Sequence, residues 1–250
     1  MSNPFLSVVI PAYQESLRIP KTLEQIYKYL NRQDYTFEII VVDDGSKDGT
    51  SDIAKEVLDS KICTILKNEG NRGKGYSVRR GVLEAKGEYV LFSDADLSTP
   101  ISELEKMLPH LKSDYDIVIG SRALVDRSCE RDMLWYREIM GRVYNAFGQL
   151  LLFPGVMDSQ CGFKCFTNAA AKTIFSKQLV NGFSFDGEIL FLANKQNYRI
   201  KELPVNWYNT AQSKVRVVRD SMKMFLDLIY IRWIHRRTRS GEMEKRGRES

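Results

Sequence analysis

Short apolar strands and amphipathic helices alternate through the first 120 residues. Runs rich in β-branched residues, typical of strands buried on both faces, occur at 7–10, 37–42, 62–66, 89–93 and 116–120. Apolar residues at helical spacing, together with capping residues, predict helices at 19–31, 48–58, 74–85 and 99–111. We expect Thr99 to cap the last helix, with Pro100 in its first turn. The alternation predicts an α/β fold with a doubly wound, mostly parallel sheet flanked by helices.

The pattern changes after residue 120. Helices are predicted at 133–153, 167–175 and 184–197, a strand at 200–207 and an amphipathic helix at 219–235. We expect one domain over residues 1–217, with halves at about 1–120 and 121–217, and then an amphipathic helix within 218–236. A polar, basic tail at 237–250 is expected to be disordered.

Composition bounds the class of protein. The chain has 250 residues, of which 43% are hydrophobic, enough for a substantial core. Residues 221–250 hold eight Lys/Arg against four Asp/Glu, so most of the net charge of +5 lies there and suits an anionic surface of lipid or nucleic acid. No signal peptide or transmembrane helix is expected. With two histidines and four cysteines, a zinc site and a Ser-His-Asp enzyme are disfavoured.

Acidic and polar loops follow three of the predicted strands. They read PAYQE at 11–15, DDGSKDGT at 43–50 and DAD at 94–96. Turn formation alone explains any one loop, but like charges gathered at one sheet edge need a compensating cation. Asp94 and Asp96 are two positions apart and are oxygen ligands suited to Mg²⁺ or Mn²⁺. Mg²⁺ usually completes its shell with water and phosphate, so a diphosphate ligand is predicted.

The segment NEGNRGKG at 68–75 precedes a predicted helix. Its glycine spacing fits neither a P-loop nor a dinucleotide fingerprint. A basic loop at a helix N-terminus is still a reasonable anion site. Arg72 and Lys74 are its candidate charges.

Four segments together resemble glycosyltransferase family 2, whose members are inverting enzymes of the GT-A fold. They are VVIPAYQE, IIVVDDGSKDGT, NRGKG and SDAD, in that order. The resemblance implies a GT-A domain whose first half binds a nucleotide sugar and whose DxD motif, Asp94 and Asp96, binds the metal. The residues implicated in nucleotide-sugar binding are Pro11, Tyr13, Glu15, Asp43, Asp44, Gly45, Arg72, Lys74, Asp94 and Ala95.

Further segments resemble the polyprenyl- and dolichyl-phosphate glycosyltransferases, and most closely the dolichyl-phosphate β-glucosyltransferase type. They are GSRA, DSQCGFKCF, FSFDGEIL and ELPVNW, and the similarity covers about residues 5–217. Asp96, Asp186 and Arg122 are implicated as catalytic, with Asp186 as a base or as a group that orients the acceptor. Glu188 is expected to support it. The candidate ligands of the acceptor phosphate are Arg122, Arg131, Arg137, Gln160, Lys164, Lys214 and Arg216.

The expected reaction moves a hexose to polyprenyl or dolichyl phosphate with inversion and a divalent metal. UDP-glucose is the favoured donor, with GDP-mannose and UDP-N-acetylglucosamine as alternatives. Three other readings stay open: a glycan or protein hydroxyl as acceptor, a nucleotidyltransferase, and a non-catalytic binding module.

Membrane attachment is expected to be peripheral, on the cytoplasmic face, because the transmembrane segments of many relatives are not seen here. Residues 133–153 and 222–234 carry apolar and aromatic side chains with basic neighbours, which is typical of interfacial helices. Core packing and a homodimer interface are the alternatives for both segments.

Overall fold

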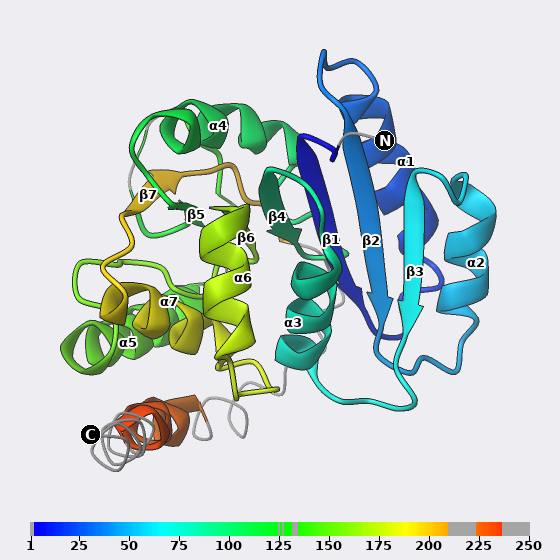
Figure 1. The fold of residues 1–250 in the computed structure, drawn as a ribbon. Coiled ribbons are helices and arrows are strands. Elements are labelled where there is room, and N and C mark those ends of the chain that lie inside the picture. The colour runs from blue at the N-terminus through cyan, green and yellow to red at the C-terminus, as the bar shows by residue number, and fades with distance from the viewer. Residues whose placement is uncertain (1–2, 125, 127, 132–134, 210–223, 237–250) are drawn as a thin grey trace, which may run out of the picture.

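A central seven-stranded sheet organises the chain (Figure 1). The computed structural model describes residues 3–124, 126, 128–131, 135–209 and 224–236. Its strand order is β3-β2-β1-β4-β6-β5-β7, and only β6 runs antiparallel to its neighbours. The strands are β1 (Leu6–Ala12), β2 (Phe37–Asp43), β3 (Cys63–Lys67), β4 (Tyr89–Ser93), β5 (Ile117–Ser121), β6 (Phe163–Thr167) and β7 (Ile200–Pro204). The predicted mostly parallel α/β sheet is therefore confirmed, although β6 was not predicted.

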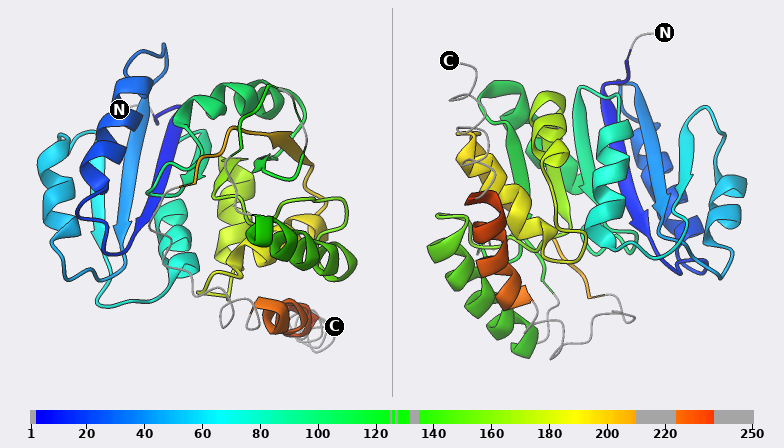
Figure 2. Two further views of the ribbon diagram at one scale, coloured as in Figure 1. Left: turned by 180° about the vertical axis from the view of Figure 1, so that it is seen from behind. Right: turned by 60° about the horizontal axis from the view of Figure 1, so that its bottom comes forward.

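Helices cover both faces of this sheet (Figure 2). They are α1 (Ile19–Leu30), α2 (Thr50–Val57), α3 (Lys74–Glu84), α4 (Leu104–Ser113), α5 (Trp135–Leu151), α6 (Asn168–Ser176) and α7 (Phe185–Lys195). Residues 224–236 form a further helix, here called the C-terminal helix. Helices α1, α2 and α4 pack on one face, whereas α3, α6, α7 and the C-terminal helix bury side chains on the other. The three layers bury the sheet on both sides, as expected for parallel strands.

The predicted cap of the fourth helix is wrong. A short 3-10 helix, η1 (Ile101–Glu103), comes first, and Pro100 rather than Thr99 is its N-cap. The Thr99 hydroxyl instead lies 3.8 Å from the sulfur of Cys161. The strained turn after β4, where Leu97 has a positive φ of 47°, leads directly into this segment.

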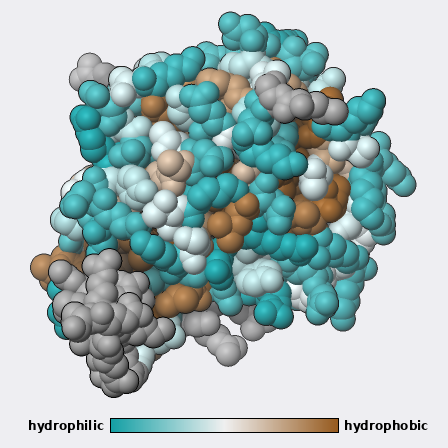
Figure 3. Space-filling model, in the orientation of Figure 1, coloured by the Kyte–Doolittle hydropathy of each residue, from teal (hydrophilic) through white to brown (hydrophobic). Residues whose placement is uncertain are grey.

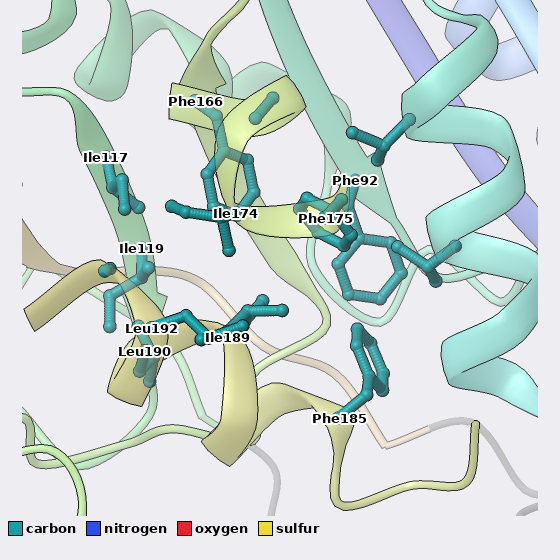
Figure 4. Close-up of a cluster of buried hydrophobic side chains, with 14 of the residues drawn as sticks. Phe92, Ile117, Ile119, Phe166, Ile174, Phe175, Phe185, Ile189, Leu190 and Leu192 are labelled. Atoms are coloured by element: carbon teal, nitrogen blue, oxygen red, sulfur yellow. The ribbon is translucent and has the colours of Figure 1, made fainter. Parts of the chain in front are cut away.

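An aromatic cluster joins β4 and β6 to the helices of the second half (Figure 4). The rings of Phe92 and Phe185 meet edge to face at 5.7 Å, and those of Phe166 and Phe175 at 5.5 Å. All four side chains are fully buried. Such packing fixes the start of α7 against the end of β4, where the polar loops gather.

Candidate active site

A cavity of about 760 Å³ opens at the carboxyl ends of the parallel strands. Loops after β1, β2, β4 and β5 converge there with the start of α3 and the first turn of α7. Most of the predicted site residues share its wall. They are Pro11, Tyr13, Glu15, Asp44, Lys74, Asp94, Ala95, Asp96, Arg122, Gln160 and Asp186.

Two of the predicted nucleotide-sugar residues support the loops and are not among the lining residues. The buried Asp43 carboxylate accepts hydrogen bonds from the Ser46 amide, at 2.9 Å, and from the Ser51 hydroxyl. Gly45 has a φ of +75°, and an added Cβ would lie 2.5 Å from Gly70. A side chain is therefore excluded where the loop after β2 meets the loop before α3.

Asp44 fixes the loop that carries Arg72 and Lys74. Its carboxylate accepts hydrogen bonds of 2.8 Å from the Asn68 side chain and from the backbone amides of Arg72 and Gly73. The Arg72 guanidinium lies 5.1 Å from the centroid of the Tyr76 ring and is not part of the cavity wall. Of the two predicted basic residues, Lys74 is the one that lines the cavity.

Lys74 and the acidic turn after β4 form the charged centre of the site. The Lys74 ammonium pairs with Asp94 at 2.7 Å, and Asp96 accepts a hydrogen bond of 3.0 Å from the Ser98 amide. Burial raises the pKa of Asp94, as does the charge of Asp96, although Lys74 opposes the shift. Burial opposes the charge of Lys74, but the surrounding carboxylates, Asp94 foremost, outweigh it and raise the pKa of Lys74. The centre is therefore rich in carboxylates that a cation would stabilise.

The residues present fit a divalent metal that is shared with a diphosphate. Within the described ranges, no three His, Cys, Asp or Glu side chains come together as a complete metal site. Asp94 and Asp96 supply two carboxylates, the number Mg²⁺ commonly takes when phosphates complete its shell. Gly162 makes room for the Asp94 carboxylate, because a Cβ there would lie 1.9 Å from its Oδ2.

Arg122 is held at the cavity wall by Asp158. Its Nε and Nη2 donate to the two carboxylate oxygens at 2.7 and 2.9 Å, and its backbone amide donates at 2.9 Å. Glu202 on β7 accepts from the Met157 and Asp158 amides and so fixes the loop that carries Asp158. Asp158 was not predicted as a site residue, although it opens the segment DSQCGFKCF.

The other predicted acceptor-phosphate residues divide into several groups. Gln160 lines the cavity, whereas the Arg131 guanidinium donates to the Arg122 carbonyl. Lys164 was predicted to contact the acceptor phosphate, but its side chain is fully buried in the sheet and does not line the cavity. The Arg137 side chain, Lys214 and Arg216 lie outside the described residues.

Asp186 and Glu188, two residues apart on α7, have different surroundings. The Asp186 carboxylate lines the cavity and pairs with Lys164. Glu188 is fully buried and accepts hydrogen bonds from the amides of Leu179 and Val180 and makes one with His235. Glu188 thereby joins the loop before α7 to the C-terminal helix, and its supporting role at the site stays a prediction.

One end of the cavity is apolar. It lies between α5 and the C-terminal helix, where the Tyr144 and Phe225 rings meet at 5.7 Å. Val143, Phe183 and Met224 also line it. The spacing of apolar residues in the sequence predicted both helices. It did not show which of their side chains face the cavity, because each helix carries apolar residues on more than one face. The cavity thus joins the charged groups around Asp94 to a region rich in apolar side chains, where Glu138 and Arg142 of α5 also line the wall.

Comparison with known proteins identifies the class. Residues 7–175 match the family described as Glycosyl transferase family 2. The chain therefore belongs to glycosyltransferase family 2 and is a glycosyltransferase. It is 37% identical over 246 residues to dolichyl-phosphate beta-glucosyltransferase of Dictyostelium discoideum, covering 93% of this chain and 75% of that protein. The protein of the same description from Homo sapiens is 34% identical over 244 residues, covering 91% and 74%.

Solved structures confirm the GT-A fold. Glucosyl-3-phosphoglycerate synthase of Mycobacterium tuberculosis in complex with phosphoglyceric acid superposes with a TM-score of 0.70 at 19% identity, covering 91% of this chain and 80% of that one. The same enzyme with Mn²⁺ and uridine-diphosphate-glucose gives a TM-score of 0.69 at 18% identity, covering 91% and 79%. These similarities concern the fold alone.

Proposed function

We propose that this chain transfers glucose from UDP-glucose to dolichyl phosphate or another polyprenyl phosphate, with inversion at the anomeric carbon. The observation that carries the proposal is the cavity itself, which joins the acidic and basic groups around Asp94 to an apolar end between two helices. A nucleotide sugar suits the first end, and a lipid chain suits the second. The curated relatives named above have dolichyl phosphate and a glucosyl group in their descriptions.

On the donor side, Asp94 and Asp96 would hold Mg²⁺ or Mn²⁺. The ion would supply Lewis-acid neutralisation of the departing diphosphate. The Lys74 ammonium, already paired with Asp94, lies where it can also bind a diphosphate oxygen. Asp44 keeps the loop that carries Lys74 in place, so this cation is positioned before the donor binds.

On the acceptor side, Arg122 is the candidate for binding the lipid phosphate. Asp158 fixes the plane of its guanidinium at the cavity wall. A phosphate oxygen would attack the anomeric carbon as the bond to the diphosphate breaks, and the diphosphate would leave with the electron pair. An ionised phosphate needs positioning more than deprotonation, so Asp186 would orient the acceptor or take a remaining proton from it.

We also propose that α5 and the C-terminal helix meet the membrane. Ile139, Phe147 and Leu150 are exposed on α5, and Leu226, Ile229, Tyr230 and Trp233 are exposed on the C-terminal helix. In Figure 3, hydrophobic residues (brown) lie next to the grey atoms at the lower left, where Figure 1 draws α5 and the C-terminal helix. No helix in the part of the chain that the structure describes combines the length and apolar character needed to cross a bilayer. A docked helix pair would bring the apolar end of the cavity to the lipid.

The test is transfer of labelled sugar to lipid. The protein is incubated with polyprenyl phosphate in vesicles and a panel of radiolabelled nucleotide sugars, with Mg²⁺, with Mn²⁺ or with a chelator. Labelled lipid is expected from UDP-glucose and is expected to disappear with the chelator. Labelling from GDP-mannose or UDP-N-acetylglucosamine would instead assign one of the alternative donors. Labelling of no lipid by any donor would defeat the proposal.

A further inference from the structure

A buried ammonium group lies directly behind the cavity wall. Lys164 is the second residue of β6, opposite Phe92 on β4 and Ile119 on β5. Its side chain has no exposed surface. A charge held so far from water is costly unless a group of opposite sign and hydrogen-bond acceptors surround it. The identity of its partners therefore indicates why a lysine occupies a strand that is otherwise apolar.

Of the two acceptors of Lys164, Asp186 lines the cavity and Cys161 is buried beside it. Its Nζ donates to the Cys161 carbonyl at 2.6 Å and to Oδ1 of Asp186 at 2.5 Å. The Asp186 carboxylate is almost completely buried, yet it lines the cavity. One oxygen of the carboxylate is thus bound from the sheet interior while the side chain faces the substrate space. Such a contact restricts the orientation of Asp186.

This ion pair and the one at the acidic turn both have their lysine against the Phe92 ring. The Nζ of Lys164 lies 5.8 Å from the ring centroid, and the Nζ of Lys74 lies 5.3 Å from it. Lys74 pairs with Asp94 and lines the cavity, whereas Lys164 does neither. The two lysines therefore have different roles, although both lie against one aromatic ring.

We propose that Lys164 is a positioning residue that fixes the Asp186 carboxylate at the cavity wall for the transfer reaction. The inference rests on the proposed function only in assigning Asp186 to the reacting end of the cavity. It replaces the predicted contact between Lys164 and the acceptor phosphate. Because Lys164 acts through Asp186, its loss matters only while Asp186 is present.

The test is a cycle of three variants: Lys164→Met, Asp186→Asn and the double variant. The rate of nucleoside diphosphate release from UDP-glucose is measured with and without polyprenyl phosphate, together with donor affinity by calorimetry. Lys164→Met and Asp186→Asn are each expected to lower kcat by about 100-fold, the cost of misplacing a reacting group by about 1 Å. Donor affinity is expected to change less than about threefold, because neither residue is assigned to the donor.

The double variant decides the matter. Its turnover is expected to be no slower than that of Asp186→Asn. Lys164→Met alone leaves the Asp186 charge buried without a partner, whereas the double variant removes both charges, so it can be measured even if Lys164→Met does not fold. Multiplied losses in the double variant, or a Lys164→Met effect confined to the KM of polyprenyl phosphate, would overturn the proposal. Lys172→Met is the matched control, because Lys172 donates to the Val82 and Leu83 carbonyls. If polyprenyl phosphate does not accelerate nucleoside diphosphate release by the unaltered protein, the proposed function fails. The three variants can then still be compared by their rates of UDP-glucose hydrolysis without the lipid.

Discussion

At the scale of single residues, Asp158 holds the Arg122 guanidinium in a fixed orientation at the cavity wall. Burial alone would raise the pKa of this carboxyl, but the charge of Arg122 and the hydrogen bonds it donates outweigh burial and lower the pKa. The Asp158 carboxylate also accepts a hydrogen bond from the backbone amide of Gln160. Asp158 thus joins the end of β5 to the loop before β6 while it orients Arg122.

This pair predicts a pH-dependent contribution to stability. The pKa of Asp158 is lower in the folded chain than the unfolded value of about 3.9, so the contribution is complete above that value and is lost as pH falls through the folded pKa. Asp158→Asn should lower the free energy of unfolding at pH 7 by about 3 kcal/mol, because it leaves Arg122 without its anion. Urea unfolding from pH 7 to pH 3 should show this difference shrinking below about pH 4.

The control for Asp158 is Asp52→Asn. Asp52 is largely exposed and pairs with Lys55 on the surface of α2, so its loss should change stability by less than about 0.5 kcal/mol at any pH in this range. Equal, pH-independent effects of the two substitutions would contradict a structural role for the Arg122–Asp158 pair.

Gly162 supports a second prediction at the residue scale. A Cβ at this position would overlap Oδ2 of Asp94, so Gly162→Ala should displace that carboxylate. Turnover is expected to fall about 100-fold, since a displacement of about 1 Å has that cost, and Mn²⁺ titration should show weaker activation. Gly182→Ala is the matched control, because nothing lies within 4 Å of its added Cβ. Unchanged kinetics for Gly162→Ala would mean that the position of Asp94 does not matter.

At the scale of elements, the sequence predicted the strands that are continuous apolar runs and missed β6. Strands β1, β2 and β4 end in the polar loops that drew attention to the site. In β6 the pattern is interrupted by Lys164, whose charge is balanced by Asp186, 22 residues further along the chain. Arg122 and Asp158 are 36 residues apart. Local patterns do not reveal such long-range pairs, so the strand and the residue Asp158 were found only in the folded chain.

The C-terminal helix has two faces of different character. Leu226, Ile229, Tyr230 and Trp233 follow helical spacing on the exposed side. Leu228 and Ile231 are buried against the core. An exposed aromatic and aliphatic row beside basic residues is the pattern of a helix that lies on a lipid surface.

This exposed row gives a prediction for membrane binding. Ile229→Ser together with Trp233→Ser should weaken binding to vesicles of phosphatidylcholine and phosphatidylserine by at least about tenfold, because each apolar side chain contributes about 1.5 kcal/mol when buried in lipid. Co-sedimentation measures the change. Leu83→Ser on α3 is the control, since Leu83 is near the end of α3 away from the cavity. Binding as strong as that of the control would argue against this face as the membrane contact.

At the scale of the whole molecule, the C-terminal helix is part of the core as well as of the surface. Leu228 and Ile231 contribute to the cluster that includes Phe92 and Phe185. His235 is buried against Glu188, which holds the loop before α7. That loop also reaches the donor side, because the Asn181 carbonyl accepts a hydrogen bond from the Tyr76 amide of α3. The expected division into a domain at 1–217 and a separate helix at 218–236 is therefore open to a direct test.

Truncation provides that test. A chain ending at residue 223 loses the buried Leu228 and Ile231 and leaves Glu188 without His235, whereas a chain ending at residue 236 keeps all three contacts. The shorter chain should be less stable by about 3–6 kcal/mol, since each buried aliphatic side chain contributes about 1.5–3 kcal/mol. That loss is a large part of the roughly 5–15 kcal/mol that stabilises a typical domain, so urea unfolding should give a much lower midpoint for the shorter chain. Equal midpoints would mean that the helix is an appendage to a domain that folds without it, and vesicle binding would then be the only property it confers.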